Sequence, residues 1–174
     1  MIKRIVVGIS GASGVNLGKK FIELLPKDIE VYTIITNNAK IVANREKQII
    51  LDNSDISECT ASGSFKTDVM AIIPCSMNTL AKVSCGIADN LLTRSASVML
   101  KERRHLLLAP REMPFGQIAL ENMLKLSKMG VTIAPPVLAY YSNQNSLEKM
   151  EDFMIGKWFD LLNIEHDLYE RWKG

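Results

Sequence analysis

Short apolar runs recur along this chain, and each is followed by a glycine or proline and then by residues with helical spacing. The runs predict strands near residues 5–7, 29–36, 69–73, 106–109 and 131–134. The intervening segments predict helices near 15–25, 39–46, 77–84, 91–103, 116–129 and 147–162. Runs without a polar side are typical of strands covered on both faces. The alternation predicts an α/β fold of the doubly wound, Rossmann-like or flavodoxin-like kind, with a mainly parallel sheet.

The chain has 174 residues, which suits one domain spanning 1–174. Residues 47–65 mix polar and small residues without a clear period, so this stretch is interpreted as mostly loop. A proline ends the third predicted strand at Pro74. The net charge is only +2, and no basic stripe of the kind that binds nucleic acid is present.

Cysteine and histidine usage argues against metal or disulfide chemistry. Cys59, Cys75 and Cys85 form no C-x-x-C pair and are odd in number, which favours a reducing compartment. His105 and His166 have no Ser or Cys partner nearby in sequence, which disfavours a catalytic triad or a metal site. The first residues lack a signal-peptide pattern or an apolar run long enough to span a membrane. We therefore expect a soluble cytoplasmic protein that uses no metal.

A glycine-rich turn, Gly8-Ile9-Ser10-Gly11-Ala12-Ser13-Gly14, joins the first predicted strand to the first helix. Glycines let the backbone approach a ligand closely, and the helix N-terminus offers free N–H groups to an anion. Ser13 adds a hydroxyl donor. The turn does not match the dinucleotide pattern G-x-G-x-x-G, and a tight turn without a ligand is the alternative.

A second polar loop, Pro74-Cys75-Ser76-Met77-Asn78-Thr79-Leu80, follows the third predicted strand and opens a helix. Ser76, Asn78 and Thr79 offer donors beside exposed backbone N–H groups. The alternative for Ser76 is a simple helix cap. Cys75 is interpreted as a packed small residue rather than a nucleophile.

Several charged and aromatic residues are further candidates for an anion site. Arg94 and Lys101 lie seven apart on one predicted helix, and their alternative is solvated surface. Arg111 could grip a phosphate and the adjacent Glu112 could move a proton, or the two could form a surface ion pair. The remaining candidates are aromatic residues at 140–141 and 172, where ordinary packing or a subunit contact is the alternative.

In order and spacing, these stretches resemble the UbiX flavin prenyltransferase family along almost the whole chain. The most specific matches are the two loops and four later stretches: Gly86-Ile87-Ala88-Asp89-Asn90-Leu91-Leu92-Thr93-Arg94, Leu100-Lys101-Glu102-Arg103-Arg104, Pro110-Arg111-Glu112 and Leu120-Glu121-Asn122-Met123-Leu124.

The resemblance implies roles for individual residues. It assigns FMN contacts to Gly11, Ala12, Ser13, Thr36, Ser76, Met77, Asn78, Thr79 and Arg111. It places six residues around the prenyl phosphate: Glu46, Arg94, Lys101, Glu112, Tyr141 and Lys157. Trp172 would close the site. Lys157 stands where many relatives have Arg, so the charge remains while the bidentate fork is lost. The region 47–62 is shorter and more polar than in several relatives, which affects the placing of Glu46.

The reaction implied by the resemblance is an alkylation of reduced FMN at N5 by dimethylallyl phosphate, followed by ring closure at C6. Arg94, Lys101, Lys157 and Tyr141 would stabilise the departing phosphate without a metal. Catalytic proton transfer would involve Ser13, Glu46 and Glu112, with Lys101 also counted as catalytic. The product would pass to a UbiD-type decarboxylase. The resemblance also implies a large homo-oligomer, a dodecamer among the options, with sites at subunit contacts.

Two other readings share the fold. An FMN-dependent cysteine decarboxylase would carry a catalytic His before the third predicted strand, where this chain has Ala61-Ser62-Gly63-Ser64-Phe65. A non-catalytic flavin carrier would leave Arg94, Lys101, Glu112 and Tyr141 without a shared purpose.

Overall fold

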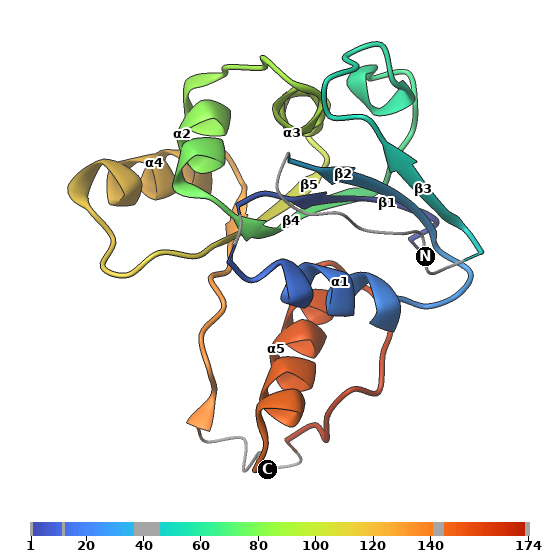
Figure 1. Cartoon of the computed structure of the whole chain (residues 1–174), viewed down its shortest axis with the longest axis vertical. Coiled ribbons are helices and arrows are strands. Elements are labelled where there is room, and N and C mark those ends of the chain that lie inside the picture. Colours follow the sequence, from blue (N-terminus) through green and yellow to red (C-terminus); the bar gives the residue numbers. More distant parts are fainter. Residues whose placement is uncertain (1, 12, 37–45, 141–144, 173–174) are drawn as a thin grey trace.

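The computed structural model describes residues 2–11, 13–36, 46–140 and 145–172, which form one six-stranded sheet with helices on both faces (Figure 1). The strand order is β3-β2-β1-β4-β5-β6, and every ladder is parallel. The strands are β1 (Arg4–Ile9), β2 (Glu30–Ile35), β3 (Gln48–Leu51), β4 (Val69–Cys75), β5 (His105–Pro110) and β6 (Thr132–Ile133). This is the doubly wound strand order of Rossmann folds, so the predicted fold class is confirmed.

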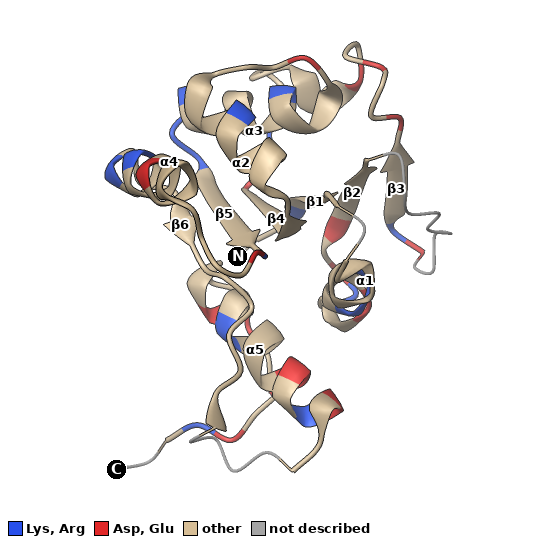
Figure 2. Ribbon diagram, turned by 60° about the vertical axis from the view of Figure 1, so that its left-hand side comes forward, with Lys and Arg blue, Asp and Glu red and all other residues tan. Residues whose placement is uncertain are grey.

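Five α-helices within the described residues cover the sheet. They are α1 (Val15–Leu24), α2 (Met77–Cys85), α3 (Leu91–Lys101), α4 (Gln117–Lys128) and α5 (Leu147–Leu161), with a short 3-10 helix η1 at Cys59–Ala61. Figure 1 shows α1 and α5 below the sheet, with α2 and α3 above it. In Figure 2 the strands are largely free of charged residues, which lie mainly on the helices and at strand ends. Central strands buried on both sides read as continuous apolar runs, which is why the sequence pattern predicted them.

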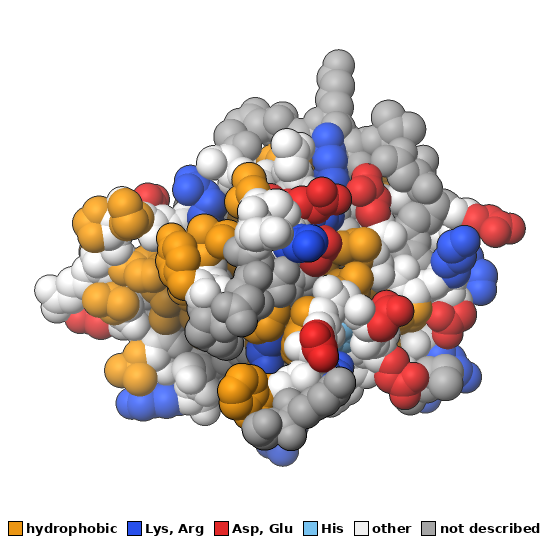
Figure 3. Space-filling view, turned by 90° about the horizontal axis from the view of Figure 1, so that it is seen from below, with side chains coloured by type: hydrophobic (Ala, Val, Ile, Leu, Met, Phe, Trp, Pro, Cys, Tyr) orange, Lys and Arg blue, Asp and Glu red, His pale blue; other side chains and the backbone are white. Residues whose placement is uncertain are grey.

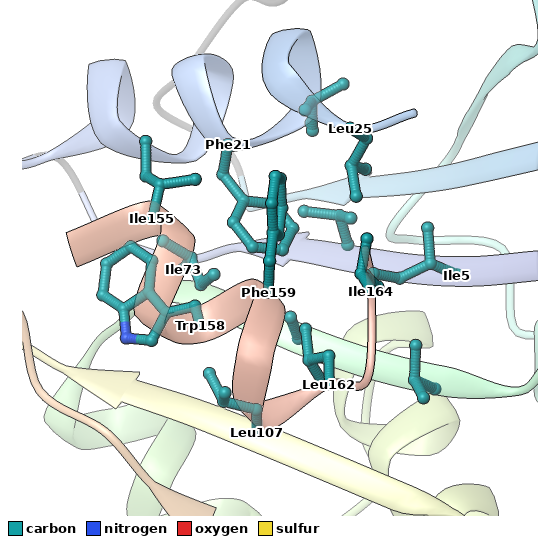
Figure 4. Packing of buried hydrophobic residues seen from close by; sticks show 14 of the residues in the cluster. Ile5, Phe21, Leu25, Ile73, Leu107, Ile155, Trp158, Phe159, Leu162 and Ile164 are labelled. Carbon is teal, nitrogen blue, oxygen red and sulfur yellow. The ribbon is translucent and has the colours of Figure 1, made fainter. Parts of the chain in front are cut away.

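Each face of the sheet has its own apolar core. Below the sheet, Phe21 of α1 packs edge-on against Phe159 of α5 at 5.0 Å between ring centroids, beside the buried Trp158 (Figure 4). Above the sheet, residues of α2, α3 and α4 pack on β4 and β5, including Leu80, Leu92 and Leu126. Burying each such side chain contributes about 1.5–3 kcal/mol, so both helix layers are fixed to the sheet.

Helix ends follow from local sequence. The Ser76 hydroxyl accepts a hydrogen bond from the Thr79 backbone N–H and caps α2, and Gly86 ends that helix in the left-handed conformation. Asn90 and Thr93 form a reciprocal capping box at the start of α3. These caps fix the loops after β4 and before α3.

The structure corrects three details of the predicted elements. The stretch interpreted as loop contains β3, which pairs with β2. Pro74 does not end the third predicted strand, because β4 continues to Cys75 past a register irregularity between Ile72 and Cys75. The helix predicted to reach Arg103 ends at Lys101, and Arg103 has a φ of 54°. The helix predicted for 39–46 lies outside the described residues except for Glu46, which is in a turn.

Exposed hydrophobic side chains are concentrated near α4 and in the segment after β6. Met113 is 92% exposed, Ile118 75%, Val137 68% and Tyr140 80%. Seen from below, hydrophobic side chains gather on the side of the molecule where α4 lies (Figure 3). In the described part of the chain, no helix combines the length and apolar character needed to cross a membrane.

Candidate functional site

The candidate site is the region at the carboxyl edge of the sheet where β1 and β4 end side by side, here called the crevice after the usual ligand position in such folds. These neighbouring strands are parallel, and the helices that follow them cover opposite faces: α1 joins the core below the sheet and α2 the core above it. The two connecting loops therefore diverge at the carboxyl edge of the sheet. Open α/β sheets bind ligands at such a switch point.

Ser10, a buried residue at the end of β1, ties the two loops together. Its backbone N–H donates to the Pro74 carbonyl at 3.1 Å, and its hydroxyl accepts from the Ser76 backbone N–H at 2.9 Å. These bonds fix the glycine turn against the loop that opens α2. The sequence analysis gave Ser10 no role, because only the strand pairing reveals its neighbour across 66 positions of the chain.

Gly11 and Thr36 lie next to each other on the β2 side of the crevice. The Thr36 hydroxyl accepts from the Gly11 backbone N–H at 3.4 Å, and the Thr36 backbone N–H donates to the Ile9 carbonyl at 3.0 Å. Gly11 has a φ of 91°, and a Cβ added there would meet the Cβ of Ser76 at 3.4 Å. Thr36, Gly11 and Ser76 therefore lie next to one another, and their contacts with FMN stay a prediction.

The N-terminus of α1 opens into the same crevice. Gly14 caps the helix with a φ of 88°, no side chain caps the first turn, and that turn carries no acidic residue. Free N–H groups without a competing carboxylate form a ready anion site. A Cβ at Gly14 would stand 3.5 Å from the Arg111 Cδ, so the arginine approaches this helix end. Ser13, just before it, is exposed.

The loop after β4 divides its polar groups between structure and solvent. Ser76 caps α2 and its hydroxyl donates to the Thr79 hydroxyl at 3.0 Å, so the capping alternative describes its side chain. Thr79 is buried, Met77 half-buried and Asn78 exposed. Burial raises the pKa of the Cys75 thiol to about 12, so Cys75 is a protonated packing residue, as predicted.

Arg111 and Glu112 leave β5 beside this loop. The Arg111 backbone N–H donates to the Cys75 carbonyl at 3.2 Å, and both side chains are exposed. The Glu112 carboxylate accepts from the Met113 backbone N–H at 3.1 Å. Arg111 and Glu112 do not form the surface ion pair considered as their alternative.

Arg94 and Lys101 each bond to a group outside the two loops. Arg94 donates through Nε to the Ala61 carbonyl at 3.2 Å, at the end of the 3-10 helix η1. Lys101 ends α3 just before β5 begins, so it lies at the amino edge of the sheet, opposite the two loops. Its ammonium pairs with Glu102 at 3.1 Å. Their assignment to the prenyl phosphate stays a prediction.

Three more predicted residues also lie apart from the loops. Glu46 lines an open, charged hollow at the amino edge with Lys3, Arg4 and Asp68. Lys157 is on α5 below the sheet, and Trp172 is 93% exposed in the C-terminal tail. Ala12 and Tyr141 lie outside the described residues.

The two histidines are remote from the crevice. His105 bonds Thr132 at 2.9 Å, and burial lowers the pKa of its ring. His166 bonds Asp160 at 3.0 Å. Among the residues with described positions, no group of three or more His, Cys, Asp or Glu side chains could hold a metal ion.

Comparisons with known proteins agree with this geometry. The flavoprotein family model matches residues 1–157. A flavin prenyltransferase UbiX from Helicobacter pylori (strain ATCC 700392 / 26695) is 50% identical, covering 97% of this chain and 98% of its own length.

Two solved structures are also similar over nearly their whole length. One is AnUbiX (PadA1) in complex with FMN and dimethylallyl pyrophosphate: TM-score 0.91, 35% identity, 100% of this chain and 99% of that chain. The other is a dodecameric FMN-dependent UbiX-like decarboxylase from Escherichia coli O157:H7: TM-score 0.89, 34% identity, 98% and 100% coverage. The doubly wound sheet and the two loops joined through Ser10 and Ser76 agree with the similarity to these relatives. The chain belongs to the UbiX flavin prenyltransferase family of flavoproteins.

Proposed function

We propose that this chain binds FMN in the crevice between β1 and β4 and transfers a dimethylallyl group to it from dimethylallyl phosphate. The observation that carries the proposal is the pair of loops joined by Ser10 and Ser76 at the switch point. Family membership supports the enzyme class, and a relative's structure with FMN and dimethylallyl pyrophosphate supports the ligand classes.

The crevice residues fit an FMN phosphate. The α1 N-terminus has no side-chain cap and no acidic residue in its first turn, and Ser13 and Arg111 stand beside it. Gly11 and Gly14 keep the backbone free of side chains where a ligand would approach. Helix N–H groups, a hydroxyl and a guanidinium are donors that bind phosphate well. We propose that Ala12 and Thr36, with the loop residues Ser76, Met77, Asn78 and Thr79, complete the flavin contacts.

Reduced FMN would supply two nucleophilic positions, N5 and C6. N5 would bond to C1 of the dimethylallyl group as the C–O bond to phosphate breaks. C6 would bond to C3 of that group as its double bond takes up a proton at C2, and C6 would lose its own proton. The protein residues bind and orient the donor and offset the charge on the leaving phosphate. Arg94, Lys101, Lys157 and Tyr141 would hold this phosphate. Ser13, Glu46 and Glu112 would accept and return protons, since each has an oxygen that can do so.

We propose that neighbouring copies of the chain complete the donor site. Lys101 and Glu46 lie at the sheet edge opposite the loops, so they could reach a flavin only from another copy. The exposed apolar side chains near α4 and after β6 support self-association, because large apolar patches mark contact surfaces. The similar Escherichia coli protein is dodecameric.

We further propose that the product is delivered to a UbiD-type decarboxylase in the cytoplasm. Prenylated FMN is a modified cofactor rather than an end product, so a second enzyme must use it. Three free cysteines in the described residues fit a reducing compartment.

Mass spectrometry of the bound flavin tests the reaction. Purified protein is incubated anaerobically with FMN, dithionite and dimethylallyl monophosphate, and in parallel with the diphosphate. The proposal predicts flavin that is heavier by one prenyl unit with at least one donor. Unchanged FMN with both donors would refute prenyl transfer, and carbon dioxide release from a cysteine conjugate would favour the decarboxylase alternative.

A further inference from the structure

Asp160, near the end of α5, is the anchor of the C-terminal tail. Its carboxylate accepts hydrogen bonds from three tail residues: His166 at 3.0 Å, Arg171 at 2.8 Å and the Tyr169 hydroxyl. The His166 side chain is only 3% exposed. A single carboxylate therefore gathers three donors spread over residues 166–171.

The hydrogen bonds around His166 define its tautomer. Its Nδ1 accepts from the Leu168 backbone N–H at 3.2 Å, so the ring proton is on Nε2 and points at Asp160. His166 thus donates to Asp160 within the tail, and the cations Arg171 and Lys157 lie beside the same carboxylate. Burial alone would raise the pKa of Asp160, but hydrogen bonds from Arg171, Tyr169 and His166 outweigh it and hold the pKa well below its usual range.

Gly156, one helical turn before Asp160, provides independent evidence that the tail is closely docked. A Cβ at this position would come within 2.6 Å of the Tyr169 ring and 2.8 Å of the His166 ring. The tail rings therefore lie directly on the backbone of α5. The Tyr169 ring also packs against the Phe153 ring, tilted by 49° and with 4.6 Å between centroids.

Lys157 shares the same carboxylate. Its ammonium lies 3.8 Å from the Asp160 Oδ2, and its side chain is 52% exposed. An exposed ion pair at this distance is weak. The Lys157 ammonium therefore lies near Asp160, and its charge stays available to an anion. Lys157 also lines an apolar cavity of about 280 Å³ between α5 and the segment after β6, with Val137, Leu138 and Phe153 among the walls.

We propose that Asp160 is a positioning residue for the donor. It docks the C-terminal tail on α5 and keeps the Lys157 ammonium close to the rim of the apolar cavity, where the phosphate of an allylic donor would meet it. This inference rests on the proposed function for its kinetic consequence, whereas the docking of the tail stands on the contacts alone.

The test compares Asp160→Asn and Gly156→Ala with Asp167→Asn, a control at an exposed tail position that contacts none of the cluster in the described hydrogen bonds. Asp160→Asn removes the charge, whereas Gly156→Ala pushes the tail away by collision and leaves every charge in place. Gly→Ala in a helix interior otherwise favours the helix, so its damage would come from the tail. Each variant counts as folded if it still binds FMN and if its thermal unfolding curve matches that of the wild type.

Two readouts separate tail docking from the reaction. Hydrogen–deuterium exchange of residues 165–171 should rise at least tenfold in both variants and stay at the wild-type level in the control. The KM for dimethylallyl monophosphate should rise about tenfold, or ~1.4 kcal/mol, with kcat and FMN affinity nearly unchanged. In a Lys157→Ala background, Asp160→Asn should add little to KM, because the two changes remove one interaction.

Each result decides something. Wild-type exchange rates in Asp160→Asn and Gly156→Ala would overturn tail docking. If Asp160→Asn raises KM equally in the wild-type and Lys157→Ala backgrounds, the positioning role is overturned. The same conclusion follows if a variant releases the tail but leaves KM unchanged. If wild-type protein prenylates no flavin, the proposed function and the kinetic role both fall, and the exchange experiment still decides whether Asp160 anchors the tail.

Discussion

The backbone N–H of Ser76 donates a 2.9 Å hydrogen bond to the buried hydroxyl of Ser10, and this bond joins the two loops at the ends of β1 and β4, where we propose that flavin binds. Ser10 is 1% exposed, so water cannot replace its hydroxyl. The site thus depends on a contact inside the protein as well as on the residues that face the ligand.

Replacing Ser10 with Ala should lower the free energy of unfolding by about 1–3 kcal/mol, because the Ser76 N–H loses its acceptor. FMN should also bind more weakly, since the loops are no longer held together. Urea unfolding and quenching of flavin fluorescence measure the two effects. Ser127→Ala, at an exposed position on α4, is the control and should change neither. Unaltered FMN binding in Ser10→Ala would show that the bond does not shape the crevice.

Gly14 and Gly86 form a matched pair for testing the glycine turn. Both have positive φ, 88° and 72°, so an alanine at either strains the backbone by about 1–2 kcal/mol. Only Gly14 lies at the crevice, whereas a Cβ at Gly86 meets nothing within 4 Å. Gly14→Ala should therefore weaken FMN binding about tenfold or more, while Gly86→Ala loses similar stability and keeps its affinity. Equal affinities for the two variants would argue against phosphate binding at α1.

Cys75 should be inert towards thiol reagents in the folded protein, since burial raises its pKa to about 12. Cys85 is exposed and should react first, and Cys59, half-buried with its pKa raised by burial, more slowly. Titration with a chromogenic disulfide, with and without denaturant, gives the order. Cys75→Ala should retain prenyl transfer at a stability cost on the order of 1 kcal/mol. Loss of turnover with FMN still bound would instead make Cys75 a reacting group.

Lys101→Ala should reduce prenyl transfer by about 100-fold or more, because a cation facing the leaving phosphate would be lost. Its exposed pair with Glu102 contributes little, so stability should change by less than about 0.5 kcal/mol. Lys66→Ala, an exposed lysine before β4, is the control. Turnover equal to that of the control would remove Lys101 from the site.

A complementation experiment tests whether copies share the site. Lys101→Ala and Gly14→Ala alter opposite edges of the sheet, and each alone should show reduced activity when the FMN concentration is kept below the weakened Kd of Gly14→Ala. Coexpressed, they should form mixed oligomers in which some sites combine two intact halves, so activity should return. No recovery in verified mixed oligomers would mean that one chain supplies both residues.

Asp160 should make stability depend on pH in acid. Its folded pKa is depressed, so its contribution is fully present above the unfolded value of about 3.9 and is lost as pH falls through the folded pKa. The difference in unfolding free energy between wild type and Asp160→Asn should stay constant above about pH 5 and shrink below about pH 4. A difference that does not shrink in acid would contradict charge-dependent anchoring.

Much of the fold was predictable because strands buried on both faces produce continuous apolar runs. Strand β3 was missed because it is a four-residue edge strand, and Ile49 and Ile50 are about 40% exposed amid polar neighbours. Strand β4 passes Pro74 because the ladder with β5 shifts register there, which local sequence does not reveal.

The site was predictable in part. The two loops meet because parallel strands end at one edge, so their proximity followed from the fold class. The role of Ser10 and the tail cluster at Asp160 depend on contacts between distant residues, which periodicity cannot indicate. The separation of Lys101 from the crevice likewise follows from its place at the end of α3, just before β5.

The structure of the protein crystallised with FMN tests the central claim most directly. We predict that the flavin phosphate lies at the N-terminus of α1, within hydrogen-bonding distance of Ser13 and the following N–H groups, with the ring system between Gly11 and Ser76. FMN bound at the charged hollow near Glu46, or anywhere away from the ends of β1 and β4, would contradict the account.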